Sequence, residues 1–381
     1  MESDNKLFLL DAYALIYRAY YAFIKNPRIN SKGFNTSAIL GFVNTLEEVL
    51  KKENPSHIGV AFDPSGPTFR HEAFEQYKAQ REETPEAIRL SVPIIKDIIH
   101  AYRIPILEVT GYEADDVIGT LATEAGRQGI TTYMMTPDKD YGQLVTNNVF
   151  MYRPKHTGGF EVMGIEEVKA KFDIQSPAQV IDMLGLMGDA SDNIPGCPGV
   201  GEKTAQKLIA EFGSIENLLE HTDQLKGALK TKVETNKELI TFSKFLATIK
   251  IDVPIQLEMD KLVREQADED SLRRIFEELE FRTLIDRVLK KENSAGGVTT
   301  ATGSKTATTK SAPSPLPLFP EEGGAIQGDL FANFTGNEAG EAQKSNLETL
   351  ETLSCDYQLI DTEKKRAEII QKLLTSKILS L

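Results

Sequence analysis

Cysteines and long apolar runs are scarce in this sequence. Its two cysteines, Cys197 and Cys355, lie far apart and lack the spacing of metal ligands. This usage is typical of reduced thiols in a cytosolic protein, and it argues against a disulfide framework or a zinc site. No apolar run approaches the roughly 18 residues of a membrane-spanning helix, and the amino terminus lacks the basic stretch of a signal peptide. We therefore expect a cytoplasmic protein without a membrane partner.

Basic residues are also in deficit. The sequence has 43 Lys and Arg against 57 Asp and Glu, a net charge of -14. Counted in this way, the charge argues against a nucleic-acid partner. The argument weakens if many of the acids bind divalent cations, because a bound metal ion reverses the local field. With 381 residues, 40% of them hydrophobic, the chain is long enough for two or three domains.

Acids follow directly on three short apolar stretches. Residues 7–10, 57–62 and 131–136 have the pattern of buried parallel strands, and helical patterns separate them, for example at 37–52 after a predicted N-cap at Thr36. The acids that follow these stretches are Asp11, Asp63, Asp138 and Asp140. Parallel strands present their carboxyl ends at one edge of the sheet, where binding sites lie. We therefore expect an α/β fold with a largely parallel sheet and an acidic site at that edge.

A further acidic group opens the helix predicted at 116–128, after a strand predicted at 104–109. Glu113, Asp115 and Asp116 fall within one helical turn. Two such charges in close contact repel by about 4 kcal/mol at an effective dielectric near 20. A group of this kind is tolerated when a cation binds in it, or when the acids spread into solvent. The three strand-end acids favour the cation.

A second, helical unit begins near residue 176. A helix predicted at 178–188 is followed by two more acids, Asp189 and Asp192, and then by a glycine-containing hairpin at 199–205 that leads into the next helix. The first N–H groups of that helix can bind a phosphate. In the alternative interpretation the glycines only permit a tight turn. Lysines in and after the hairpin, beginning with Lys203, favour binding to a nucleic-acid backbone.

Several motifs stand in the order and at the spacing of one known family. They are Asp11, Phe62-Asp63, Phe69-Arg70, Y-K-x-x-R at 77–81, G-Y-E-A-D-D-V at 111–117, D-K-D at 138–140 and G-D-x-S-D-N-I-P-G-x-x-G-V-G-E-K-T-A at 188–205. Over about residues 5–290 the sequence thereby resembles the 5′-nuclease domain of bacterial DNA polymerase I. The resemblance implies a PIN-like nuclease core with a helical arch, followed by a helix-hairpin-helix unit with three turns.

The resemblance assigns a set of metal-binding carboxylates. The nine positions that match are Asp11, Asp63, Glu113, Asp115, Asp116, Asp138, Asp140, Asp189 and Asp192. It implies two or more Mg²⁺ ions that hydrolyse phosphodiester bonds, with Mn²⁺ as a plausible substitute. Lys78, Arg81, Asp63 and Asp116 are the predicted catalytic residues. None of the five histidines is needed as a base.

The resemblance also assigns contacts with DNA. The predicted DNA-binding residues are Arg18, Arg70, Tyr77, Lys78, Arg81, Gly199, Gly201, Lys203 and Thr204. Lys78 and Arg81 would bind the scissile phosphate from the arch, and the hairpin could hold a K⁺ ion on its carbonyl oxygens. The expected substrates are 5′ flaps and nicked or gapped duplexes, including RNA–DNA primers, in replication and repair.

These features divide the chain into four parts. Residues 1–175 form the nuclease core, with the arch at about 66–102, and residues 176–290 form the helix-hairpin-helix unit. Residues 291–346 are rich in small and polar residues and are expected to be a disordered linker. Residues 347–381 resemble the start of a proofreading-like 3′-5′ exonuclease domain, with no polymerase module. Gln327–Phe331 in the linker resembles a peptide that docks on a sliding clamp.

Three other functions are weighed against this hypothesis. A PIN-type ribonuclease shares a four-acid core, but it does not explain Asp189, Asp192 and the hairpin. A non-catalytic DNA-binding module would use the hairpin and keep the acids for structure. A phosphomonoesterase with Asp138 as nucleophile is the weakest, because no Asp-x-Asp pattern follows the first strand.

Overall fold

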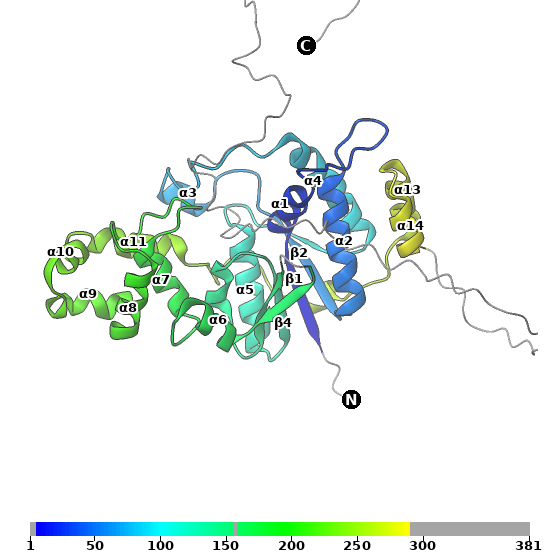
Figure 1. Ribbon diagram of the computed structural model, residues 1–381. Coiled ribbons are helices and arrows are strands. Elements are labelled where there is room, and N and C mark those ends of the chain that lie inside the picture. The colour runs from blue at the N-terminus through cyan, green and yellow to red at the C-terminus, as the bar shows by residue number, and fades with distance from the viewer. Residues whose placement is uncertain (1–4, 156–157, 290–381) are drawn as a thin grey trace, which may run out of the picture. The chain divides into compact units, whose positions relative to one another are not determined.

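A six-stranded sheet lies at the centre of the chain (Figure 1). The computed structural model describes residues 5–155 and 158–289. The strands are β1 Lys6–Asp11, β2 His57–Ala61, β3 Ile106–Leu107, β4 Thr131–Met135, β5 Val149–Pro154 and β6 Phe160–Met163, in the order β3-β2-β1-β4-β5-β6. All neighbours run parallel except β5 and β6. The predicted α/β class with a largely parallel sheet is therefore confirmed.

The sheet differs from the prediction at its two edges. The strand expected at 104–109 is reduced to the two residues of β3. Pro105 has no N–H to donate, and β3 pairs only with β2, so pairing is short there. At the other edge β5 and β6 were not predicted, and their antiparallel pairing makes the sheet mixed.

Helices cover both faces of the sheet. Successive side chains of β1 point to opposite faces, so each face is apolar and is buried by its own set of helices. Phe8 and Leu10 face one cluster, and Leu7 and Leu9 face the other. The helices of the first cluster are α1 Ala12–Ala22, α2 Ser37–Lys52, α4 Glu86–Ala101, α13 Glu269–Glu278 and α14 Arg282–Leu289. Those of the second include α5 Ala114–Arg127 and α6 Ile165–Phe172. The helix predicted at 37–52 is confirmed, but the Thr36 hydroxyl donates to the Arg28 carbonyl and caps no helical N–H.

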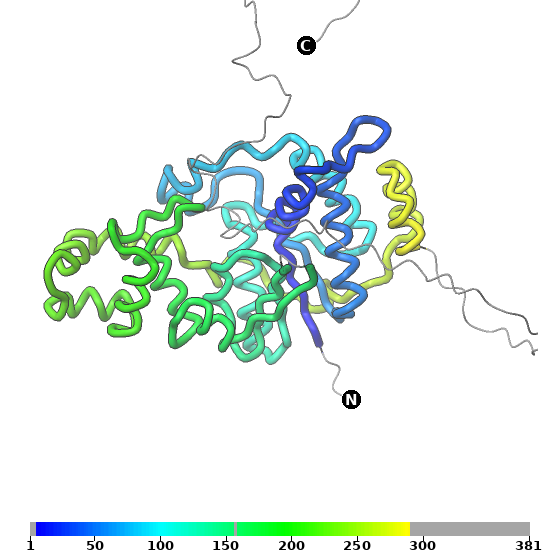
Figure 2. The backbone as a smooth tube through the Cα atoms, viewed as in Figure 1, coloured from blue at the N-terminus to red at the C-terminus, as the bar shows by residue number. Residues whose placement is uncertain are grey.

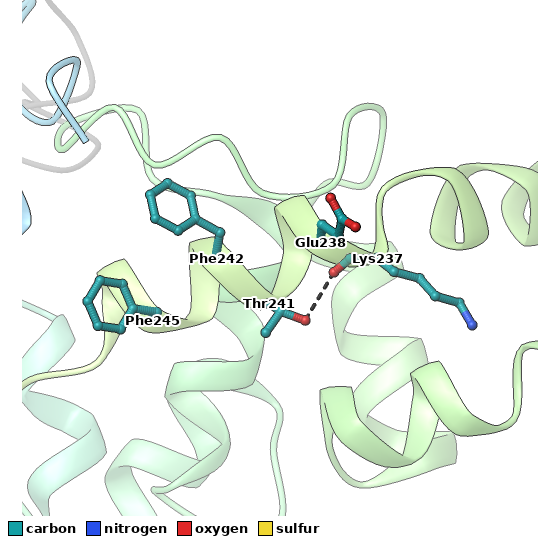
Figure 3. Close-up of a pocket in the computed structure, with 5 residues that line it drawn as sticks. All are labelled: Lys237, Glu238, Thr241, Phe242 and Phe245. Atoms are coloured by element: carbon teal, nitrogen blue, oxygen red, sulfur yellow. Dashed lines mark hydrogen bonds between the residues drawn. The ribbon is translucent and has the colours of Figure 1, made fainter. Parts of the chain in front are cut away.

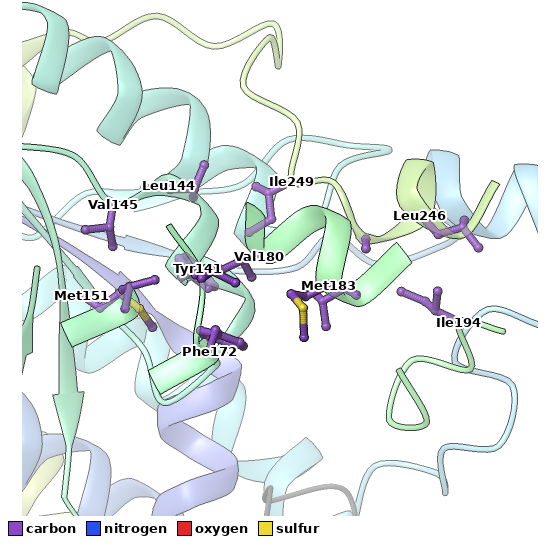
Figure 4. Close-up of a cluster of buried hydrophobic side chains, with 14 of the residues drawn as sticks. Tyr141, Leu144, Val145, Met151, Phe172, Val180, Met183, Ile194, Leu246 and Ile249 are labelled. Atoms are coloured by element: carbon purple, nitrogen blue, oxygen red, sulfur yellow. The ribbon is translucent and has the colours of Figure 1, made fainter. Parts of the chain in front are cut away.

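The helical unit shares the second cluster with the sheet. Its helices are α7 Gln179–Met187, α8 Glu202–Phe212, α9 Ile215–Glu220, α10 Gly227–Thr235, α11 Lys237–Ala247 and α12 Met259–Leu262. Met183, Leu246 and Ile249 of this part pack in one cluster with Tyr141 and Met151 of the sheet part (Figure 4). In the tube view the chain then continues to α13 and α14, which lie on the opposite side from α8–α10 (Figure 2). This continuous packing holds the loops of the helical unit against the edge of the sheet.

The segment predicted as a helical arch contains two helices and a stretch without helix. Helix α3 spans Phe69–Ala73, and α4 follows from Glu86. Residues 74–85, which we call the arch segment, form turns and bends. Lys78 there has φ +56°, outside the helical region, and Pro85 disfavours helix in the residue before it. The prediction that the basic residues of this segment sit on a helix is therefore wrong.

The linker, the clamp-like peptide and the proofreading-like segment lie outside the described residues. Within the described residues, no helix has the length and apolar character needed to cross a membrane.

Candidate active site

Five aspartates lie together at the carboxyl edge of the sheet and are called the acid cluster. They are Asp11, Asp63, Asp115, Asp138 and Asp140. Asp11 is the last residue of β1, Asp63 follows β2, Asp138 and Asp140 follow β4, and Asp115 lies in the first turn of α5. Parallel strands place these ends side by side, so residues far apart in the sequence reach one site.

Local hydrogen bonds orient these carboxylates. Asp11 is the N-cap of α1 and accepts from the Ala14 N–H at 3.1 Å. Asp63 accepts at 2.7 Å from the N–H of Ala114, the first residue of α5. Such N–H groups at helix starts lack helical partners and bind anionic side chains. The short loops after the strands therefore hold these two acids in fixed positions.

Burial raises the pKa of every member of the acid cluster, and the charges of neighbouring acids add to the rise. The pKa of Asp11 rises to about 7 because of its burial and the nearby charge of Asp63. The pKa of Asp115 rises far above its ordinary value through burial and the charges of Asp11 and Asp138. Burial and the charge of Asp138 likewise raise the pKa of Asp140 far above its ordinary value. Lys78, which lies near Asp63 and Asp115, and Lys139, which lies near Asp140, offset this rise in pKa only in part.

One carboxylate oxygen marks where such a cation fits. In the described part of the chain, Oδ1 of Asp140 is buried and accepts no hydrogen bond, whereas the Asp138 Oδ1 accepts from the N–H of Asp140 at 2.9 Å. A buried carboxylate oxygen without a partner is costly. Carboxylate oxygens are the hard ligands that Mg²⁺ and Mn²⁺ take. The donor set of the acid cluster therefore fits a divalent cation.

Two other predicted metal ligands bind cations of the arch segment. The ammonium of Lys78 lies 2.7 Å from a Glu113 oxygen and 3.6 Å from an Asp192 oxygen. Arg81 donates to the other Asp192 oxygen at 2.5 Å, and the Tyr77 hydroxyl lies 3.0 Å from an oxygen of each acid, so that it donates its proton to one of them at a time. Burial alone would raise the pKa of Glu113 and Asp192, but these cations lower it in both. The arch segment thus lies directly against the acidic site.

Asp116 differs from the other acids. Its side chain is fully buried, and the guanidinium of Arg70 donates to both of its oxygens at 2.8 Å. The N–H groups of Glu113 and Lys250 donate to the same carboxylate. Every lone-pair direction therefore has a partner in the chain. Both Asp116 oxygens thus bind groups of the chain in this arrangement, and its assignment as a metal ligand and catalytic residue stays a prediction.

Arg70 and Tyr77 do not fit the prediction that they contact DNA. Arg70 is 2% exposed, and besides Asp116 it binds Glu113 and the carbonyls of Leu246 and Thr248. Tyr77 is 3% exposed, with its hydroxyl on two carboxylates. A buried side chain whose polar atoms are all bonded has no donor left for a phosphate. Both residues instead hold acids in place.

The turn between α7 and α8 brings Asp189 and Asp192 to the site. Asp189 and Ile194 exchange both backbone hydrogen bonds, at 2.9 and 2.8 Å, which closes a small loop. This loop contacts the arch segment, because Lys78 N–H donates to the Asp192 carbonyl and Gln80 to the Ala190 carbonyl. Lys139 forms an ion pair with Asp189 at 3.0 Å.

No three His, Cys, Asp or Glu side chains of the described residues are arranged as a ready-made metal cage. For three of the predicted ligands the bonds above account for this. Glu113, Asp189 and Asp192 are turned towards Lys78, Lys139 and Arg81, so their oxygens serve ammonium and guanidinium groups. The nine predicted ligands are thus brought to one region, and their assignment as metal ligands stays a prediction.

The remaining predicted contacts with DNA lie at two separate places. Arg18 on α1 donates to the Lys155 carbonyl at 3.1 Å. In the hairpin, Gly201 is the N-cap of α8, Lys203 is exposed, and the N–H of Thr204 donates to Gly201. The Lys232 ammonium already binds the Gly199 carbonyl at 3.1 Å. The α8 helix begins at Glu202, three residues earlier than predicted.

Two uncharged residues of the site were not predicted. The Tyr141 hydroxyl donates to Asp115 at 3.0 Å, and Thr136 donates to Asp11 at 3.1 Å. Tyr141 is fully buried. Its position directly after the D-K-D motif is the only signal in the sequence that points to it.

Protein-family comparison identifies the class. Residues 6–173 match the family described as 5′-3′ exonuclease, N-terminal resolvase-like domain. Residues 175–270 match the family described as 5′-3′ exonuclease, C-terminal SAM fold. The two matches follow one another along the chain. The chain therefore belongs to the 5′-3′ exonuclease family.

Curated relatives of the chain include bacterial DNA polymerases. The chain is 42% identical over 291 residues to DNA polymerase I of Bacillus subtilis, covering 76% of this chain and 33% of the relative. It is 40% identical over 287 residues to DNA polymerase I of Bacillus caldotenax, covering 74% and 32%. The chain thus spans about a third of the length of these relatives.

Solved structures share the fold. T5 5′-exonuclease with bound zinc superposes with a TM-score of 0.54 at 21% identity, over 72% of this chain and 98% of that one. The catalytic core of Rad2 in complex with DNA gives a TM-score of 0.51 at 18% identity, over 76% and 93%.

Proposed function

We propose that this 5′-3′ exonuclease cleaves DNA at 5′ flaps and at nicked or gapped duplex ends, with two divalent metal ions, in removal of RNA–DNA primers and in repair. The observation that carries the proposal is the acid cluster at the carboxyl edge of the sheet, next to an arch segment that carries Lys78 and Arg81. The similar structures of T5 5′-exonuclease with bound divalent metal ions and of the Rad2 catalytic core with a DNA substrate support it.

The acid cluster is the proposed metal site. Asp11, Asp63, Asp115, Asp138 and Asp140 would hold the ions, with Mg²⁺ as the expected metal and Mn²⁺ as a substitute. Bound divalent ions activate a water molecule and neutralise charge on the reacting phosphate. Glu113, Asp189 and Asp192 would join the site when their present cationic partners turn to the substrate. The buried, unpartnered Oδ1 of Asp140 supports this assignment.

Lys78 and Arg81 are the proposed phosphate-binding residues. Each already contacts a carboxylate of the site, so each reaches the position where an anion would lie. A scissile phosphate would take the place of those carboxylates, and the two cations would stabilise the negative charge that develops on it. The arch segment would thereby hold the DNA strand over the acids.

The hairpin at 199–205 is the proposed contact with the duplex backbone. The exposed Lys203 and the start of α8 support a role in phosphate binding. A K⁺ ion on hairpin carbonyls and a sliding clamp bound at Gln327–Phe331 remain part of the proposal. Binding of a peptide of residues 322–336 to a clamp, followed by fluorescence polarisation, would test the second.

The test is cleavage of a 5′-flap duplex with and without Mg²⁺, with products sized on a gel. We expect cleavage near the flap junction only with metal. Asp63→Ala should abolish it, and Lys78→Ala should lower the single-turnover rate by a factor of about 100 or more, the loss typical of a transition-state contact. Asp97→Ala removes an exposed acid on α4 and serves as the matched control.

Three results would contradict the proposal. Full Mg²⁺-dependent activity of Asp63→Ala would remove the acid cluster from the reaction. Preference for single-stranded RNA over flap DNA would favour the PIN-type ribonuclease. Binding of the flap without any metal-dependent cleavage would favour a non-catalytic module.

A further inference from the structure

Four phenylalanines from two distant segments form an aromatic patch. Phe69 lies in α3, Phe74 follows its end, and Phe242 and Phe245 lie on α11. The rings of Phe242 and Phe245 are stacked, with centroids 6.2 Å apart and planes at 19°. Phe69 meets Phe245 edge-on at 6.0 Å, and Phe74 meets Phe242 edge-on at 5.6 Å.

The patch borders an open hollow on α11. Lys237, Glu238, Thr241, Phe242 and Phe245 line this hollow of 460 Å³, and Figure 3 shows the two rings projecting from neighbouring turns of the helix. Phe245 is 43% exposed and Phe242 is partly buried. Exposed aromatic side chains gathered in this way mark a binding surface more often than a lone exposed apolar residue does.

A chain of hydrogen bonds ties the patch to the acidic site. Arg70, which follows Phe69 in α3, donates to the carbonyls of Leu246 and Thr248 at the end of α11, at 2.9 and 2.8 Å. The same guanidinium binds Asp116 and lies 4.5 Å from the Phe69 ring. The aromatic patch is therefore held in a fixed position one side chain away from the carboxylates.

We propose that the aromatic patch binds an unpaired nucleobase of the DNA strand held at the active site. This inference rests on the proposed function. A nucleobase is flat and stacks on aromatic rings whatever its sequence, which suits an enzyme that reads structure. Of the stacked pair, Phe245 is 43% exposed, so its ring is accessible to a base in the hollow that both residues line.

The charged groups around the patch favour a nucleotide over an apolar peptide. The ammonium of Lys250 lies 5.1 Å from the Phe69 ring, and Lys237 is exposed at the other end of the hollow. Both can bind the phosphates that flank an unpaired base. Glu238 offers a carboxylate acceptor for the exocyclic amino group of adenine, cytosine or guanine. Lys237 donates to the Leu219 carbonyl at 3.1 Å and Lys250 lies 3.8 Å from the Asp252 carboxylate, surface contacts that a phosphate can replace and an apolar partner cannot.

Fluorescence anisotropy on two labelled duplexes tests the proposal, with metal omitted so that the DNA stays intact. One duplex carries a short 5′ flap, and the other has the same sequence with a nick and no unpaired base. We expect Phe245→Ala to weaken binding of the flapped duplex about ten-fold, the loss of one stacked base. Binding of the nicked duplex should not change, and Phe245→Trp should retain flap binding.

Matched variants separate this effect from a loss of folding. Val263 is an apolar residue that is 45% exposed and pairs with His57 at the start of β2, at the end of the strands away from the acid cluster. The variant Val263→Ala should bind both duplexes as the wild type does. A flap with 2-aminopurine at its unpaired positions should lose fluorescence on binding to the wild type, and regain it with Phe245→Ala. Circular dichroism confirms that each variant is folded.

Several results would overturn the proposal. They are unchanged flap binding by Phe245→Ala, an equal loss on both duplexes, or no change in 2-aminopurine fluorescence on binding to the wild type. Self-association of the wild type that Phe245→Ala abolishes would assign the patch to a second copy of the chain. If the wild type cleaves the flap and the variants bind it normally, only this inference fails. If the wild type does not cleave the flap, the proposed function fails.

Discussion

At the scale of single residues, partners decide what each acid can do. Asp116 and Asp115 are neighbours in sequence, yet Asp116 is bound by Arg70 while Asp115 accepts from Tyr141 and lies among other acids. The first is satisfied within the chain and the second retains a need for a cation. Arg70 is therefore the cation of the chain that neutralises the Asp116 carboxylate, and it also binds Glu113.

We expect Arg70→Met to destabilise the fold by about 3–5 kcal/mol, because it leaves buried carboxylates without their cation. The side chain of Arg70 is 3% exposed, so solvent cannot replace the lost bonds. Urea unfolding followed by circular dichroism measures the change. Lys96→Met is the control, since it breaks the more exposed pair with Glu108 and should cost at most about 1 kcal/mol. Equal effects of the two variants would show that Arg70 is not a structural cation.

At the scale of elements, the turn after α7 links the helical unit to the site. Gly188 and Gly196 face each other across this turn with φ +75° and +61°. A Cβ on Gly196 would lie 2.3 Å from the Gly188 nitrogen. Only glycine permits so close an approach of two backbones, and the approach directs Asp189 and Asp192 towards the arch segment.

Gly196→Ala should therefore displace the loop of Asp189 and Asp192. We expect it to cost more than about 3 kcal/mol of unfolding free energy, through backbone strain and steric overlap together. Gly213→Ala is the matched control, because Gly213 has φ +80° but open space around a Cβ. It should cost only about 1 kcal/mol. Urea denaturation of both variants checks this, and equal losses would mean that the close approach is relaxed easily.

At the scale of the whole molecule, the net charge of -14 is partly concentrated in one buried group. The acid cluster makes the folded protein retain protons that the unfolded chain releases. The folded-state pKa of Asp11, about 7, lies above its ordinary value of 3.8. The contribution of Asp11 to stability is thus most favourable below pH 3.8 and falls as the pH rises to about 7.

Without divalent metal, Asp11→Asn should stabilise the protein at pH 8 and have a smaller effect at pH 5, a difference on the order of 3 kcal/mol. Mg²⁺ should raise the thermal midpoint of the wild type more at pH 8 than at pH 5, because protons compete for the same carboxylates. Differential scanning calorimetry in EDTA and in Mg²⁺ measures both. Asp97→Asn, on the surface, should change neither. A wild-type midpoint that is insensitive to Mg²⁺ at pH 8 would argue against a metal at the acid cluster.

Much of this protein was determined by the sequence itself. The alternation of short apolar runs and amphipathic helices predicts a parallel sheet with helices on both faces, since the burial of apolar side chains leaves a clear period within each strand and helix. The aspartates that end β1, β2 and β4 follow from the same pattern, because strand ends in such a sheet lie at one edge.

Only the tertiary structure decided how the acids divide their roles. Arg70 and Asp116 are bonded across 46 positions in sequence, and Tyr77 reaches Asp192 across 115. The missed β5–β6 edge and the arch segment without helix likewise depend on contacts outside any local window. Charge and burial act through space. The contacts between distant segments therefore decide which carboxylates bind a cation of the chain and which remain for a metal ion.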